Sequence, residues 1–183
     1  MPTGYQIDDQ KGRYFLTFQV VNWIDIFSRK MYVDIVIESL THCRKNKGLK
    51  LWAYVIMTNH VHVIMSAENG NLSDVIRDFK RFTATTIMKQ LRGNKRESRR
   101  KWMINLFCAA AQKHKRNIHY QFWRHDNHAV ELVSRKFIMQ KMGYIHNNPV
   151  AAGFVDHPDH WMYSSQRNYS DLQNLLDIDL FEL

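Results

Sequence analysis

The sequence predicts an α+β fold, a ferredoxin-like sandwich in which an antiparallel sheet carries helices on one face. Short runs rich in β-branched and aromatic residues alternate with longer amphipathic stretches. Their order is strand, helix, strand, strand, helix, strand and a final helix. The second and third strands are separated by only two residues, which favours an antiparallel hairpin. This order is that of the split β-α-β unit.

The first elements are marked by changes in composition. Residues 13–21 are aromatic and β-branched, which is typical of a strand. Residues 30–47 have an apolar stripe and end in basic residues followed by Gly48, which predicts a helix and its C-terminus. Residues 49–57 form the second predicted strand. The turn that follows, Thr58-Asn59, leads into the third.

The third strand is predicted over residues 60–66, and a helix follows the polar loop after it. Ser73 or Asp74 is expected to cap this helix, which carries an apolar stripe as far as Leu91. A basic insertion is then predicted at about residues 93–117, a loop followed by a helix.

The last third of the chain contains a short aromatic strand and a long helix. The strand is predicted at residues 118–123. Asp126 or Asn127 is expected to cap a helix over about 128–147, which Pro149 cannot continue. The tail at about residues 171–183 holds four acids and no base, which fits either a short helix or an acidic flap.

Length and composition indicate one globular domain covering residues 1–183. Apolar residues make up 45% of the 183 residues and charged residues 23%. No apolar run approaches the roughly 18 residues that span a bilayer, and the polar start does not resemble a secretory signal. We therefore expect a cytoplasmic protein without a membrane partner. Two cysteines, Cys43 and Cys108, cannot form a disulfide framework.

Positive charge is concentrated in one part of the sequence, which predicts nucleic-acid binding. The net charge is +9 and the pI is about 9.6. Between Lys80 and Arg116 stand twelve Lys or Arg and a single acid, Glu97. Such a segment suits the phosphate backbone. The expected DNA-binding residues are Arg77, Lys80, Arg81, Arg96, Arg99, Arg100, Lys101 and Arg124, with Trp123 as a base-stacking ring.

The tripeptide His60-Val61-His62 lies inside a predicted strand. Because side chains alternate between the two faces, both imidazoles should point to one side and Val61 to the other. Two imidazoles on adjacent same-face positions can share a divalent metal ion. A histidine pair on a solvated sheet face is the other interpretation.

Tyr144 and Asn148 are four residues apart in a predicted helix, and so lie on one face. A tyrosine hydroxyl can act as a covalent nucleophile, and the Asn148 amide oxygen could be a third metal ligand. Tyrosine near a helix end also serves for packing, so this pair alone leaves both roles open.

Three motifs in this order resemble those of the REP-associated tyrosine transposases, a bacterial family related to the transposases of the smallest insertion sequences. The stretch YIHNNPVAAGFV at residues 144–155, followed by WMYSS at 161–165, is similar to the family's tyrosine signature. Residues 53–66, AYVIMTNHVHVIMS, resemble its HUH motif of two histidines around an apolar residue. Residues 122–124, FWR, resemble its aromatic strand. The resemblance extends over residues 13–169.

The resemblance implies a role for each matching residue. Tyr144, on a late helix, would be the catalytic nucleophile, and His60, His62 and Asn148 would hold Mg²⁺ or Mn²⁺. The chain would cleave and rejoin single-stranded, hairpin-containing DNA through a covalent 5′-phosphotyrosine. Insertion-sequence relatives usually carry glutamine where this chain has Asn148. They include homodimers that share active sites as well as monomers.

Two other functions fit the same residues. A domesticated relative could hold hairpin nucleic acid without cutting it. A metal-dependent nuclease could use His60 and His62 to activate water. None of the three functions needs a nucleotide cofactor, and the chain has no Walker-type glycine–lysine loop.

Overall fold

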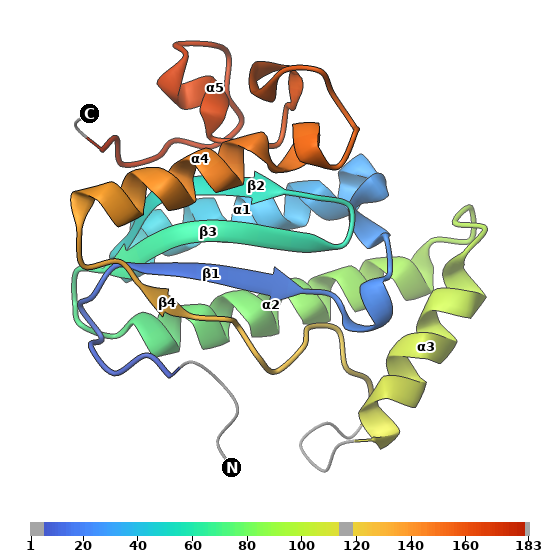
Figure 1. Ribbon diagram of the computed structural model, residues 1–183. Coiled ribbons are helices and arrows are strands. Elements are labelled where there is room, and N and C mark those ends of the chain that lie inside the picture. The colour runs from blue at the N-terminus through green and yellow to red at the C-terminus, as the bar shows by residue number, and fades with distance from the viewer. Residues whose placement is uncertain (1–5, 114–118, 182–183) are drawn as a thin grey trace.

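The computed structural model describes residues 6–113 and 119–181. Its elements in chain order (Figure 1) are β1 (Tyr14–Gln19), η1 (Val21–Trp23), η2 (Ile26–Ser28), α1 (Lys30–Lys47), β2 (Leu49–Ile56), β3 (His60–Ala67), α2 (Leu72–Gly93), α3 (Arg100–Gln112), β4 (Val130–Glu131), α4 (Arg135–Ala151), η3 (Pro158–His160) and α5 (Gln166–Tyr169). The strands form one sheet in the order β2-β3-β1-β4, and each neighbouring pair is antiparallel. The predicted α+β, ferredoxin-like fold with an antiparallel sheet is confirmed, but the helices cover both faces of the sheet and not one.

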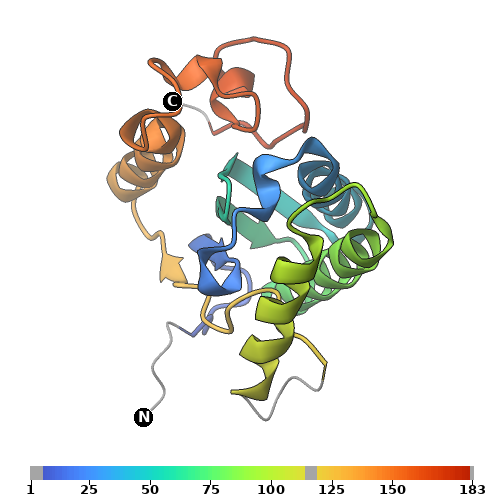
Figure 2. The ribbon, with the colours of Figure 1, turned by 90° about the vertical axis from the view of Figure 1, so that its right-hand side faces the viewer.

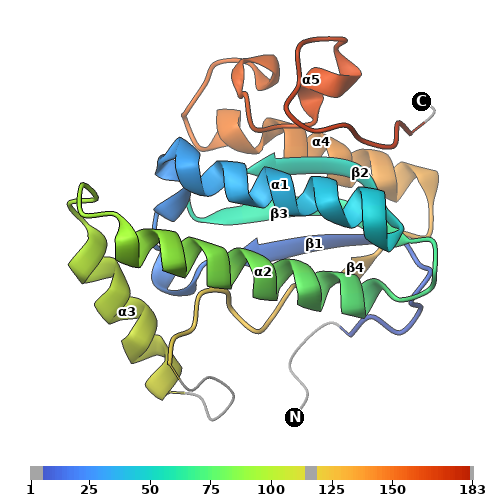
Figure 3. The same cartoon turned by 180° about the vertical axis from the view of Figure 1, so that it is seen from behind.

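Three layers position the candidate site. Helices α1 and α2 cover one face of the sheet, as Figure 3 shows. Helix α4 crosses the opposite face, and the edge-on view of Figure 2 separates the two sides. Strand alternation divides the apolar side chains accordingly: Leu16 and Val61 belong to the larger core under α1 and α2, whereas Phe15, Val55 and Ile145 belong to a smaller one under α4.

The first half of the chain follows its sequence signals closely. β2 and β3 form the expected hairpin, closed by a hydrogen bond from the Met57 amide to the His60 carbonyl (2.9 Å). Gly48 ends α1 in the left-handed region at φ 66°, which a glycine adopts without strain. The predicted capping of α2 by Ser73 or Asp74 is wrong, because the helix already begins at Leu72.

The predicted strand at 118–123 is wrong over its described part, residues 119–123. Their backbone bonds go to several neighbours: the Gln121 amide donates to Phe107, and Phe122 accepts from Val21. Only Trp123 forms an isolated bridge, with Val20. The fourth strand is instead β4, two residues that pair with the start of β1.

The last long helix is shifted from its predicted position. α4 begins after Ser134, whose side chain accepts a hydrogen bond from the Phe137 amide, so neither Asp126 nor Asn127 caps it. It continues through Pro149 to Ala151. Gly153, at φ 75°, then reverses the chain.

Hydrogen bonds from the Gly153 amide to the Val150 carbonyl and from the Phe154 amide to the Pro149 carbonyl complete this helix end. Together they form a Schellman motif. The NPVAAGF part of the tyrosine signature is therefore the C-terminal cap of α4.

The insertion and the tail both pack on the domain. Within the insertion, α3 contacts α2 and η1, and residues 114–118 lie outside the described part. In the tail, Asp179 exchanges hydrogen bonds with both backbone groups of Leu51, while 182–183 are not described. The tail forms no helix between Gln173 and Phe181. In the described residues no helix has the length and apolar character needed to cross a membrane.

Candidate active site

His60 and His62 project from β3 toward α4, as the strand alternation predicts. Their ring centroids are 4.7 Å apart, and the residue between them, Val61, is fully buried in the core on the other face. His62 is 6% exposed. The pair therefore lies under a helix and not on an open sheet surface.

Tyr144 reaches the same place from α4. Its ring centroid lies 5.3 Å from that of His62, at an interplanar angle of 67°. Phe15 supports both rings from β1, stacked on His62 at 5.4 Å and edge-on to Tyr144 at 5.9 Å. Half of the Tyr144 side chain remains exposed, at 50%. The phenol is thus fixed beside the imidazoles and still open to a substrate.

Hydrogen bonds to Nδ1 orient both imidazoles. Asn59 donates from Nδ2 to the carboxylate of Asp25 (2.9 Å), so its Oδ1 is the atom that faces His60 Nδ1 at 2.8 Å. His60 must therefore donate from Nδ1. Thr17 Oγ1 lies 2.9 Å from His62 Nδ1. In the tautomer that donates to Thr17, His62 likewise has its lone pair on Nε2, the form of a metal-ligating histidine.

Burial keeps both rings neutral. It lowers the pKa of His62 to about 3, with further contributions from the charges of His60, Lys141 and His128. Burial also lowers the pKa of His60, against a raising effect of its hydrogen bond with the Asn148 side chain. At neutral pH the two rings therefore offer lone pairs and carry no positive charge.

The donor set fits a divalent cation that shares its coordination with a substrate. Two imidazole nitrogens and the amide oxygen of Asn148, whose side chain meets His60, would give such an ion three ligands. In the described part of the chain no cluster of three or more His, Cys, Asp or Glu residues could hold a metal alone. Hard phosphate oxygens and water suit Mg²⁺ and Mn²⁺ at the remaining positions.

Lys141 places a cation beside the tyrosine. It stands one turn before Tyr144 on α4, and its Nζ lies 5.8 Å from the Tyr144 ring centroid and 4.8 Å from that of Phe15. An ammonium group in this position attracts negative charge, whether on a phenolate or on a phosphate.

His146 anchors α4 over the sheet. Its Nε2 lies 2.8 Å from Ser165 Oγ, which also bonds both backbone groups of Tyr54 on β2. Burial lowers the pKa of His146 to about 4. Trp161, in the segment after α4, donates from its indole N–H to the Ile56 carbonyl of β2 (3.0 Å). The WMYSS segment therefore holds α4, and Tyr144 with it, at a set distance from the sheet.

Several of the predicted DNA-binding residues are accessible. Arg81, Arg96, Lys101 and Arg124 have exposed side chains. Arg77 is also exposed, although its guanidinium pairs with Asp74 and Asp78 of the same helix. Arg81 and Arg124 line one cavity of about 280 Å³ beside the segment that follows residue 119.

Other predicted DNA-binding residues form bonds within the protein, and Trp123 is the clearest correction. It is 5% exposed and donates to Thr83 Oγ1, so its ring is a core contact and not a stacking surface. Lys80 donates to the carbonyl of Arg124, and burial lowers its pKa to about 8.

Two further arginines of this set have structural partners. Arg99 binds the buried carboxylate of Glu97. Arg100 donates to the carbonyl of Arg92 at the end of α2.

Three residues around the histidines were missed by the sequence analysis. Thr17 and Asn59 hold the imidazoles. Trp23 stands edge-on to His60 with ring centroids 6.1 Å apart. The signals were weak: Thr17 is one of the few polar residues in a mostly apolar strand, and Trp23 follows a polar residue directly after that strand.

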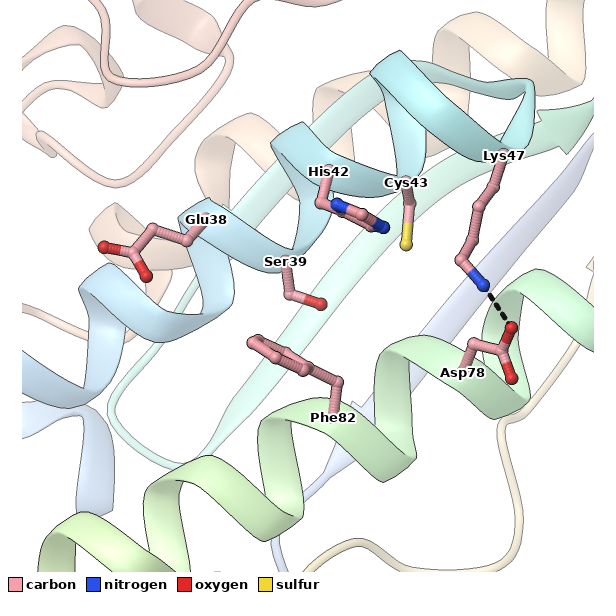
Figure 4. Close-up of a pocket in the computed structure, with 7 residues that line it drawn as sticks. All are labelled: Glu38, Ser39, His42, Cys43, Lys47, Asp78 and Phe82. Carbon is pink, nitrogen blue, oxygen red and sulfur yellow. Dashed lines mark hydrogen bonds and ion pairs between the residues drawn. The ribbon is translucent and has the colours of Figure 1, made fainter.

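A separate cavity lies on the far side of the sheet, in the groove between α1 and α2. It measures about 440 Å³, and Ser39, Cys43 and Phe82 point into it, with the ion pair between Lys47 and Asp78 at one end (Figure 4). None of its lining residues belongs to the histidine–tyrosine site.

Comparison with solved structures finds the same fold. A REP-associated tyrosine transposase bound to a REP hairpin superposes with a TM-score of 0.64 and 16% identity, over 99% of this chain and 94% of that one. A Deinococcus radiodurans R1 protein with a provisional transposase name gives a TM-score of 0.44 at 17% identity, over 80% of this chain and 95% of the other. No curated protein matches.

The family itself is shown by sequence. The family model described as "Transposase IS200 like" matches residues 13–122, which include β1, the β2–β3 hairpin, both histidines and α2. This match covers more than half of the chain. The protein belongs to the family of IS200-like transposases.

Proposed function

We propose that this transposase cleaves and rejoins single-stranded, hairpin-containing DNA through a covalent bond between Tyr144 and a 5′-phosphate. The observation that carries the proposal is the placement of the Tyr144 ring 5.3 Å from His62, with His60 adjacent. A half-exposed phenol beside two neutral imidazoles is the arrangement that tyrosine attack on a metal-bound phosphate requires. The hairpin specificity is supported by the similar solved structure, which holds a REP hairpin.

His60, His62 and Asn148 would hold a divalent ion, Mg²⁺ or Mn²⁺. When bound, such an ion supplies positive charge to the phosphate oxygens. The protein's own part is to orient the ligands: Asn59 and Thr17 fix the two rings through Nδ1. Burial of both rings keeps them unprotonated and so available as ligands.

Tyr144 is the proposed nucleophile. Its oxygen forms a bond to phosphorus while the bond from phosphorus to the 3′-oxygen breaks, and that oxygen leaves with the electron pair and is protonated by water. The phenolic proton passes to solvent, and the Lys141 ammonium stabilises the resulting phenolate. A second 3′-hydroxyl then displaces Tyr144 and restores a phosphodiester.

The proposed reaction needs neither a nucleotide cofactor nor a second subunit. One phosphate ester is exchanged for another of similar energy, so no external energy source is required. A single chain supplies Tyr144, both histidines and Asn148 to one site.

The test is covalent capture of labelled DNA. Wild-type protein is incubated with a hairpin oligonucleotide carrying single-stranded flanks, with Mg²⁺ or with a chelator, and the products are separated on a denaturing gel. We expect a metal-dependent protein–DNA adduct that peptide mapping assigns to Tyr144. Tyr144→Phe should form no adduct and bind the same DNA with unchanged affinity, whereas Tyr32→Phe, in the core on the opposite face of the sheet, should react normally.

Each alternative outcome has a clear signature. Free 5′-phosphate ends without an adduct, retained in Tyr144→Phe, would establish hydrolysis by activated water. Tight binding with no cleavage by the wild type would establish a binding protein. Either result overturns the tyrosine mechanism.

A further inference from the structure

Trp23 has a conformation and exposure that core packing does not explain. Both Trp23 and the preceding Asn22 have φ of 54°, in the left-handed region. A bulky residue there is strained. Its indole is 57% exposed, in contrast to the buried Trp123 nearby. The protein thus retains a strained backbone that presents a large apolar ring to solvent.

The Trp23 ring is coupled directly to the histidine pair. It stands edge-on to His60, with ring centroids 6.1 Å apart and an interplanar angle of 84°. The Asn59 amide contacts both residues: Nδ2 lies 3.4 Å from the Trp23 carbonyl, and Oδ1 lies 2.8 Å from His60 Nδ1. Any group stacked on this indole is therefore a neighbour of the proposed scissile phosphate.

A cavity opens on the side of Trp23 that faces α3. It measures about 420 Å³, within the roughly 300–1,000 Å³ of small-molecule sites. Its walls come from η1, from the end of α3 and from the segment after residue 119, all of which meet at the end of the sheet seen in Figure 2. Backbone hydrogen bonds from Arg124 to Gln19 and from Val21 to Phe122 hold this segment in place.

The lining of the cavity suits a nucleotide. Trp23 supplies an aromatic surface, Lys113 and Arg124 supply cationic donors, and Gln121 and Asp126 supply polar groups. Stacking on an aromatic ring together with a guanidinium is how proteins hold unpaired bases. Arg124 is exposed, yet its backbone is anchored to β1, so its guanidinium is presented from a fixed position.

We propose that this cavity binds one unpaired DNA base adjacent to the scissile phosphate, with Trp23 as its stacking surface. The inference rests on the proposed function, since it assumes that single-stranded DNA reaches His60. It makes Trp23 a residue that positions the single strand and not one that contacts a duplex stem.

The test measures binding alone, in the Tyr144→Phe background, so that no cleavage intervenes. Two probes are compared: a DNA hairpin with a single-stranded flank of about six nucleotides, and the same hairpin without it. Trp23→Ala should weaken binding of the flanked hairpin by about tenfold and leave the unflanked hairpin unchanged. The fluorescent base 2-aminopurine is placed at each flank position in turn. At one position its fluorescence should be quenched on binding, and Trp23→Ala should abolish that quenching.

Matched variants separate stacking from folding. Trp23→Phe should retain most of the flank effect. Trp23→Gly removes the ring and relieves the positive φ, so it should be at least as stable as wild type and still lose flank binding. Phe82→Ala removes an aromatic ring of similar exposure, 52%, on the opposite side of the sheet and should change neither probe.

Two results would overturn the inference. Unchanged flank binding in Trp23→Gly would exclude a base in this cavity. Equal weakening of both probes would assign Trp23 to the stem or to the shape of the site. The two proposals can fail separately, because the binding measurement needs no cleavage. If the wild type forms no adduct at Tyr144 but Trp23→Ala still weakens binding of the flanked hairpin alone, the proposed reaction is wrong and the base-binding cavity stands.

Discussion

Thr17 shows how one residue outside the presumed ligand set controls the candidate site. Its hydroxyl lies 2.9 Å from His62 Nδ1, on the strand paired with β3. This contact restrains the rotation of the ring, and when His62 donates to Thr17 the lone pair stands on Nε2. Partners of this kind usually contribute about 10–100-fold to metal affinity.

Replacing Thr17 by valine, which has the same shape but no hydroxyl, tests this role. We expect Mn²⁺ affinity, measured by calorimetry on the free protein, to fall about 10–100-fold in Thr17→Val. Thr17→Ser keeps the hydroxyl and should bind nearly as wild type does. Equal affinities for the valine variant and wild type would show that Thr17 does not support the metal.

Single residues were predictable where a local rule determines them. Strand alternation alone placed His60 and His62 on one face, and helical spacing placed Asn148 near Tyr144. Trp23 and Asn59 were not predictable, because their roles depend on the β1–η1 corner meeting the β2–β3 turn. The burial of Trp123 was missed for the same reason: its partner, Thr83, is 40 residues away in the sequence.

Helix α4 is the element on which the candidate chemistry depends most. It lies on the face of the sheet opposite α1 and α2. Its His146 bonds Ser165, which in turn bonds Tyr54 of β2. The chain that follows α4 is held on β2 by the bond from Trp161 to Ile56. Loss of this attachment would move Tyr144 away from His62 without changing either residue.

The buried neutral His146 makes this attachment sensitive to acid. Its pKa is about 4 in the folded protein, against the usual 6.5, so between these values the unfolded chain binds a proton that the folded chain does not. The free energy of unfolding should therefore be highest above pH 6.5 and decrease as pH falls toward 4. The contribution of His146 to this loss is on the order of 3 kcal/mol.

Urea unfolding at a series of pH values measures this effect. His62, with a pKa of about 3, adds a similar dependence of its own in metal-free protein. His146→Gln keeps a hydrogen-bonding group and removes one titration, so its curve should fall less steeply than that of wild type. Parallel curves for the two proteins would show that His146 does not carry the acid sensitivity.

Each wrongly predicted element has its own physical reason. Residues 119–123 have strand-like composition, but their backbone groups bond to α3 and to η1 in turn, and no ladder forms. β4 is too short to leave a periodic signal. Pro149 did not end α4, which continues for two further residues to Ala151 before the Gly153 cap.

In the whole molecule, the exposed cations predicted to bind DNA lie away from the edge of the sheet that the last part of the chain covers. The outer edge of β2 is covered by Tyr163, Ser165 and Asp179, which bond its backbone groups, so that edge is protected from pairing with other strands. The exposed cations among the predicted DNA-binding residues lie elsewhere: on α2, in the loop before α3, on α3 and at Arg124. The order of the elements was enough to predict the fold class. The path of the tail could not be predicted, nor could the division of the cations into exposed ones and ones bonded within the protein, because both depend on contacts between residues distant in sequence.

The salt dependence of DNA binding tests which cations contact phosphates. Arg81 and Arg124 line one cavity and have exposed side chains. Arg81→Gln and Arg124→Gln should each reduce the slope of log affinity against log salt by about 0.7–0.9. Arg99→Gln should leave the slope unchanged and lower stability, since Arg99 pairs with the buried Glu97. A reduced slope in Arg99→Gln would contradict this division.

The proximity of Trp23 to His60 also provides an internal optical reporter. A paramagnetic ion such as Mn²⁺ held by His60 would lie close to an indole whose ring centroid is 6.1 Å from the imidazole, and would quench its emission. Subtracting the spectrum of a Trp23→Phe variant isolates that signal from the other tryptophans. Loading of the site could then be followed in real time, without a label and without DNA.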